Sequence, residues 1–282
     1  MGSLTAHGYI AIVEIVIYVI TLTYSITNCL RYGFKRQAGW VYLSFFCVLR
    51  LCASVLVIIV EKSSHPSSAM IAAEVTVSSI ALTPLHLALL GFLTTSAQLA
   101  LGEIPENFTK LFRLCRVVLL VAIILGIVGG NKLADDSVSQ TGHTMSRVSI
   151  SLIVGVFVVL TLVTLYFLIF AQLDSQSRAL TIGIAVALPF LLVRIIYALV
   201  NAFSSSTANK FNDLTGDWVI YLVMGVIMEF IVVAVLTATG FKLQKYSGKE
   251  KMVDRRSALE YELRQAGYGV HGRALRNAET IE

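Results

Sequence analysis

Seven long apolar blocks, separated by short polar stretches, restrict the fold of this chain more than any other feature of its sequence. A helix needs about 20 consecutive, mostly apolar residues to cross the hydrocarbon core of a bilayer, and it satisfies its own backbone hydrogen bonds there. Only 14% of the 282 residues are charged, whereas soluble domains have about 25%. We therefore predict an all-α, polytopic transmembrane bundle of seven helices. The predicted spans are 8–30, 40–60, 69–97, 114–130, 148–171, 180–203 and 218–241.

Lysine and arginine are distributed unevenly between the two sides of this predicted bundle. One side carries 16 of them and the other carries four. Because cytosolic flanks are enriched in these residues, we predict a cytosolic C-terminus and an N-terminus that is outside or lumenal. The glycosylation sequon Asn107-Phe108-Thr109 then lies on the cytosolic side, and we expect it to be unused. We expect a multi-pass protein of the endoplasmic reticulum or the plasma membrane.

The net charge of +5 comes mainly from the end of the chain, where nine of the 22 lysines and arginines follow residue 241. The sequence thus predicts a transmembrane domain at 1–241 and a basic, largely disordered cytosolic tail at 242–282. We expect this tail to bind anionic lipid or a cytosolic partner, and we expect no nucleic-acid partner.

Six ionisable residues lie well inside the predicted spans, at least five positions from either end. A charge at the bilayer centre costs about 2.5–3.5 kcal/mol on insertion scales, so such side chains are expected to face the interior of the bundle. At a rise of about 1.5 Å per residue, most of them lie between the outer mouth and the midplane. Two arginines against three glutamates leave one carboxyl group in excess, which could keep its proton, bind a cation or contact a ligand. The six residues are Glu14, Arg50, Glu74, His86, Arg194 and Glu229.

This cluster is compatible with three roles. As an enzyme, the chain would bind an apolar small molecule and cyclise or isomerise it with a buried acid. Such a reaction needs no cofactor or metal, and the sequence has no recognisable motif for either. As a heptahelical sensor, or as a transporter of a lipid or small molecule, it would bind a ligand in a cavity in the outer half of the bundle. The third role is structural, with ion pairs that fix the helix packing. We name Glu74 and Glu229 as candidate catalytic acids, and Glu14, Arg50, His86, Arg194 and Tyr197 as candidate ligand-binding residues. Arg194 and Tyr197 are three residues apart, so we expect them to share a helix face.

Two stretches carry a resemblance to known proteins. RQAGWVYLSFFCVLRL at 36–51 and PFLLVRIIY at 189–197 resemble an uncharacterised family of fungal heptahelical membrane proteins, over the seven spans but not the tail. The architecture is more loosely similar to the fungal lipid-translocating exporters, and to heptahelical receptors whose extracellular cysteine-rich domain this chain lacks. It is also similar in size and span number to fungal membrane-bound terpene cyclases. That last similarity implies protonation of an epoxide or alkene by an acid in the bundle, without assigning residue roles.

Overall fold

All regular structure in the described part of the chain is helical. The computed structural model describes residues 5–32, 38–63, 67–102, 104–135, 140–170, 175–203 and 217–240. Within these ranges, seven helices are long and apolar enough to cross a membrane. The predicted all-α bundle with seven spans is therefore confirmed, whereas the tail at 242–282 lies outside the described residues.

The helices extend beyond the predicted spans at most ends. The fourth helix begins at residue 106 instead of 114, and the fifth begins at residue 140 instead of 148. Polar helix ends project beyond the hydrocarbon core and keep their backbone hydrogen bonds there, so hydropathy alone places these ends too late. The helices are α1 (Ala6–Tyr32), α2 (Ala38–Lys62), α3 (Ser68–Leu101), α4 (Glu106–Asp135), α5 (Gln140–Phe170) and α6 (Ser175–Phe203).

The seventh span, Trp218–Gly240, changes its helical form along its length. It starts with α7 (Trp218–Ile220), continues as the π-helix η1 (Tyr221–Ile227), and is α-helical again up to Gly240. The Asp217 side chain caps the start by accepting a hydrogen bond from the Val219 amide at 3.0 Å. This cap satisfies one of the amides that a helix start leaves without a partner.

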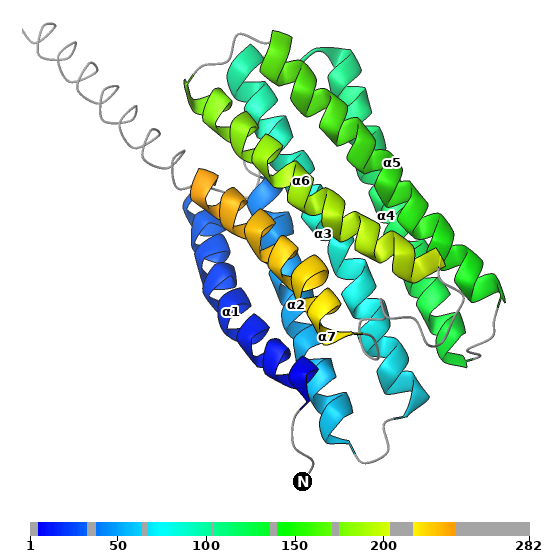
Figure 1. Cartoon of the computed structure of the whole chain (residues 1–282). Helices are drawn as coiled ribbons and strands as arrows, with labels where there is room; N and C mark the ends of the chain where they lie inside the picture. Colours follow the sequence, from blue (N-terminus) through cyan, green and yellow to red (C-terminus); the bar gives the residue numbers. More distant parts are fainter. Residues whose placement is uncertain are drawn as a thin grey trace, which may run out of the picture. The chain divides into compact units, whose positions relative to one another are not determined.

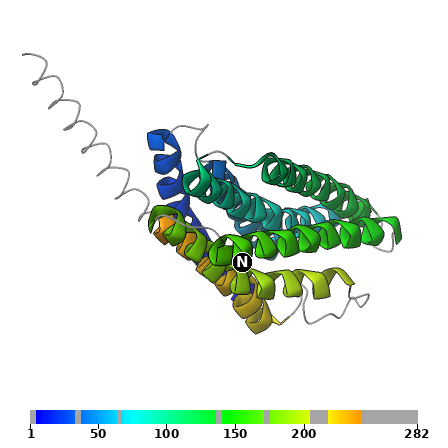
Figure 2. The same ribbon diagram turned by 90° about the horizontal axis from the view of Figure 1, so that it is seen from above.

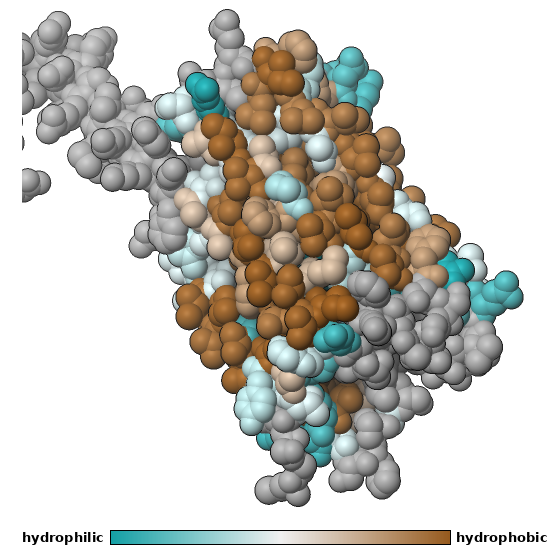
Figure 3. Space-filling view, viewed as in Figure 1, coloured by the Kyte–Doolittle hydropathy of each residue, from teal (hydrophilic) through white to brown (hydrophobic). Residues whose placement is uncertain are grey.

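The central element of the bundle is α3, which packs against α2, α4, α5 and α6 (Figures 1 and 2). It has the largest buried share of the seven spans. Large apolar side chains of the other helices remain exposed, for example Tyr9, Val13 and Ile20 on α1. Figure 3 shows such side chains covering much of the face in view. Without water around the spans, this is the surface that lipid chains contact.

Small residues bring α4 close to its neighbours. Gly126 lies against Ser149 of α5 and Ile80 of α3, and Gly130 contacts Thr76 of α3. A Cβ atom on Gly129 would lie 3.1 Å from the carbonyl oxygen of Gly142, which is a backbone atom of α5. Such small residues allow helix backbones to approach closely in a membrane.

Replacing Gly129 by leucine is therefore expected to destabilise the bundle by about 1–3 kcal/mol, because α4 and α5 would have to move apart. Gly155 of α5 is the matched control, since a Cβ atom there meets nothing within 4 Å. Thermal unfolding of the purified protein in detergent measures both variants. Equal losses in Gly129→Leu and Gly155→Leu would contradict the close contact.

Candidate functional site

The six intramembrane ionisable residues are all buried inside the bundle, and none of their side chains is more than 3% exposed. This confirms the inward orientation that the cost of a charge in lipid predicts. The candidate Tyr197 is also buried. The residues come from five helices: Glu14 from α1, Arg50 from α2, Glu74 and His86 from α3, Arg194 and Tyr197 from α6, and Glu229 from the seventh.

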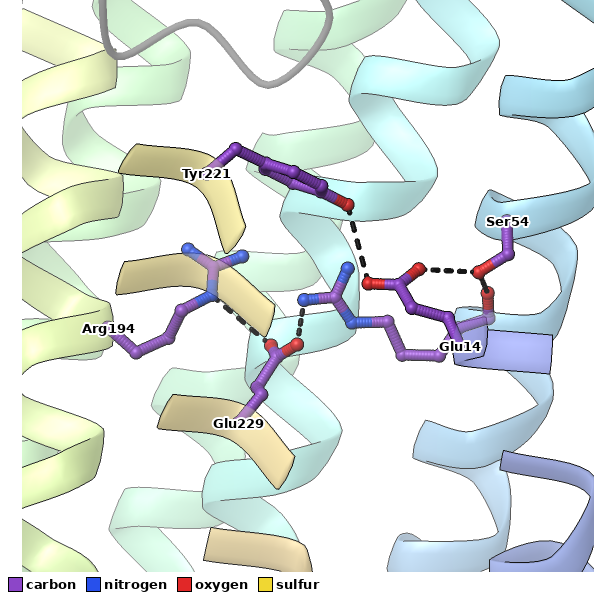
Figure 4. Close-up of polar contacts among 6 residues, drawn as sticks. Glu14, Ser54, Arg194, Tyr221 and Glu229 are labelled. Carbon is purple, nitrogen blue, oxygen red and sulfur yellow. Dashed lines mark hydrogen bonds and ion pairs between the residues drawn. The ribbon is translucent and has the colours of Figure 1, made fainter. Parts of the chain in front are cut away.

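Three of these residues form an ion triad, defined here as Arg50, Glu229 and Arg194. One carboxylate oxygen of Glu229, Oε2, contacts Arg50 Nη2. The other, Oε1, accepts a hydrogen bond from Arg194 Nε at 3.3 Å (Figure 4). A single carboxylate thus serves as counter-ion for two arginines on two different helices. The triad ties α2 and α6 to the seventh helix in the interior of the bundle.

Glu14 is held differently, by the hydroxyl groups of two neutral residues. The Ser54 hydroxyl on α2 donates to Glu14 Oε2 at 2.7 Å, and the Tyr221 hydroxyl on η1 donates to Oε1 at 3.4 Å (Figure 4). A carboxyl group held by neutral donors can gain or lose a proton without breaking an ion pair. This distinguishes Glu14 from Glu229.

The π-helix η1 places two of the contact residues. Tyr221 is its first residue, and Glu229 follows two residues after its end. Gly225, within η1, packs against the ring of Tyr221. π-Helical turns are rare and occur frequently at functional sites. The π-helix next to Glu14 and the ion triad therefore indicates that the first half of the seventh helix belongs to the candidate site.

The aromatic residues of the site include one that the sequence indicated and two that it did not. The guanidinium of Arg194 lies 5.4 Å from the centroid of the Tyr197 ring, so the predicted shared helix face is confirmed. Tyr18 and Tyr221 were not predicted. For Tyr18, the signal was available, because it follows Glu14 by four residues on α1 and so lies on the same face.

His86 and Glu74 occupy α3. His86 Nδ1 donates to the Leu82 carbonyl oxygen at 2.8 Å, and its ring contacts Phe157 of α5 at a centroid distance of 6.3 Å. These contacts tie His86 to α3 and α5 rather than to the ion triad. Glu74 is 2% exposed near the start of α3. Among the residues that the structure describes, no group of three or more His, Cys, Asp or Glu side chains is arranged to hold a metal ion.

Comparison with known protein families finds a match for most of the chain. Residues 4–246, which include all seven spans, match a family described as "Domain of unknown function (DUF7702)". No match is found among curated proteins or solved structures. The function therefore has to be argued from the side chains of the site.

Proposed function

Because the chain belongs to the DUF7702 family, which has no described function, we propose from the site itself that it is a membrane-embedded enzyme. It binds an apolar molecule inside the bundle and cyclises or isomerises it with a buried glutamic acid as the proton donor. The observation that carries this proposal is the contrast between Glu229, shared by two arginines, and Glu14, held by two hydroxyl groups.

This contrast changes which acid we propose as the donor. Proton transfer from Glu229 would break contacts with both Arg50 and Arg194, so its role is to hold the two cations in place. Glu14 can release its proton while Ser54 and Tyr221 keep the carboxylate oriented. Glu74, the other buried acid outside the triad, remains the second candidate. General acid catalysis by a positioned carboxyl group typically contributes about 10²–10⁴-fold to a rate.

The surroundings of Glu14 suit an apolar substrate. Rearrangement of a carbon skeleton proceeds through electron-poor centres, and aromatic faces stabilise positive charge at close range. The buried rings of Tyr18, Tyr197 and Tyr221 lie around the ion triad and Glu14. The side chains of the site are also buried, which limits the access of water that would otherwise trap such an intermediate.

The experiment compares lipid extracts of host membranes that contain wild type, Glu14→Gln or Glu74→Gln, analysed by untargeted mass spectrometry. We expect a product in wild type that Glu14→Gln lacks at equal protein level. Glu106→Gln is the control, because Glu106 pairs with Lys110 on an exposed surface of α4. If neither Glu14→Gln nor Glu74→Gln changes the extract, the acid mechanism is wrong.

A second candidate function is ligand sensing or transport through the same site. The π-helix η1 favours it, because a helix with a π-turn can change its register and Tyr221 connects that turn to Glu14. Gene neighbourhood separates the two candidates. Adjacent genes for synthases or oxidases support an enzyme of a natural-product pathway, and their absence supports a sensor or transporter.

For the membrane orientation, we propose a cytosolic C-terminus, so that the tail at 242–282 reaches anionic lipid or a cytosolic partner, in the endoplasmic reticulum or plasma membrane. The charge bias of 16 to four supports this orientation.

We expect Asn107→Gln to leave the electrophoretic mobility unchanged in a glycosylating host. A sequon introduced at 206–208 should instead gain a glycan. Glycosylation at Asn107 in place of 206–208 would reverse the orientation.

A further inference from the structure

The hydroxyl group of Tyr18 is an unexplained polar atom in the interior of the bundle. Tyr18 is fully buried, and its Oη atom has no hydrogen-bond partner among the residues that the structure describes. Its ring is fixed on two sides, by Phe46 of α2 at a centroid distance of 5.6 Å and by Phe230 of the seventh helix at 5.2 Å. The ring position is therefore set by packing.

Tyr18 lies on the same helix face as Glu14, the proposed acid. Tyr18 follows Glu14 by one helical turn, so the two side chains share a face of α1. Its ring contacts Phe46, which precedes Arg50 by one helical turn on α2, and Phe230, which follows Glu229 directly, so the phenol group lies near the ion triad as well. The nearby hydroxyl groups of Ser54 and Tyr221 donate to Glu14, whereas that of Tyr18 does not.

A buried hydroxyl group without a partner destabilises a fold, because it loses its hydrogen bonds to water and gains none. Phenylalanine would pack between Phe46 and Phe230 with nearly the same shape and without this cost. Fold stability alone therefore does not account for tyrosine at this position. A hydroxyl group beside a candidate acid is, however, suited to bind an oxygen atom of a bound molecule, since it both donates and accepts.

We propose that Tyr18 contacts the substrate, and that the substrate is an apolar molecule with one oxygen function, either a ketone or an alcohol. The Tyr18 hydroxyl group hydrogen-bonds that oxygen and so positions the neighbouring carbon atoms at Glu14. The rings of Phe46 and Phe230 flank that of Tyr18, and these apolar neighbours suit the hydrocarbon part of the molecule. This inference rests on the proposed function and adds the substrate class.

The test measures the melting temperature of the full-length protein in detergent with three matched probes: 2-tridecanone, 2-tridecanol and tridecane. We expect the ketone or the alcohol to raise the melting temperature of wild type and tridecane to leave it unchanged. In Tyr18→Phe, this shift should disappear, while the melting temperature without a probe equals or exceeds that of wild type. Tyr9→Phe is the control, because Tyr9 is 62% exposed on the same helix.

Three results would overturn the inference. In the first, tridecane shifts wild type as much as the oxygenated probes do. In the second, Tyr18→Phe keeps the full shift. In the third, Tyr18→Phe melts well below wild type without a probe, which would give the hydroxyl group a structural role. The proposed enzymatic function is tested separately. If the protein binds 2-tridecanone through Tyr18, but Glu14→Gln and Glu74→Gln leave the membrane extract unchanged, it is a binding protein and not an acid catalyst.

Discussion

Glu229→Gln is expected to destabilise the bundle by about 3–5 kcal/mol, because it leaves two buried arginines without their shared counter-ion. Arg50 is 1% exposed and Arg194 is 3% exposed, so water does not replace the lost charge. For a protein of ordinary stability, a loss of this size is a large fraction of the total. The variant should melt far below wild type in detergent and accumulate poorly in membranes.

Two further variants show whether the charge pairing itself causes this loss. Glu106→Gln removes an exposed partner of Lys110 and is expected to change stability by less than about 1 kcal/mol. Replacing all members of the triad together by leucine or methionine should recover much of the stability, because buried ion pairs often exchange for apolar packing at little cost. A triple variant as unstable as Glu229→Gln would show that the triad contributes more than charge balance.

Glu14→Gln is expected to lower product formation by about 10²–10⁴-fold, with little change in stability. Glutamine has the same shape as glutamic acid, and the hydroxyl groups of Ser54 and Tyr221 can each donate or accept, so both contacts can persist. The amide has no proton to transfer to a substrate. Product should be measured per amount of folded protein, quantified by size-exclusion chromatography, so that folding and chemistry are separated.

A comparison with Glu229→Gln separates a chemical role of Glu14 from a structural one. Loss of product in Glu14→Gln at a normal melting temperature supports a chemical role for Glu14. If Glu14→Gln instead melts as low as Glu229→Gln, Glu14 is a structural residue, and Glu74 becomes the remaining candidate acid. Glu14→Asp is a useful addition, because it keeps the acid and withdraws it by one methylene group from Ser54 and Tyr221.

Much of the fold could be predicted, because the ability of a segment to cross a bilayer depends on the length and composition of that segment alone. Segment length and composition determine which residues cross the bilayer, and the cost of a charge in lipid determines that Glu14, Arg50 and Glu229 face inward. The sequence also indicated the shared face of Arg194 and Tyr197, since three residues make nearly one turn. The ends of the helices were predicted less well, because polar turns such as the start of α4 remain helical outside the hydrocarbon core.

The pairing within the site could not be predicted, because depth in the membrane says nothing about which helices are neighbours. The sequence counts two arginines and three glutamates, and this count suggests one excess acid. In the structure, both arginines contact the same acid, Glu229, whereas Glu14 accepts hydrogen bonds from Ser54 and Tyr221. Tyr221 was missed for a related reason, since the π-helix η1 changes which face the residues of the seventh helix present.

The central position of α3 has a consequence for how the protein is made. It is the least apolar of the seven spans, yet it has the largest buried share. Four other helices surround it, of which α4, α5 and α6 are synthesised later. When α3 leaves the ribosome, only α1 and α2 precede it, so Glu74 and His86 enter the bilayer before most of their shelter exists. We therefore expect the nascent chain to keep α3 beside α2 or the insertion machinery until α4, α5 and α6 have been synthesised.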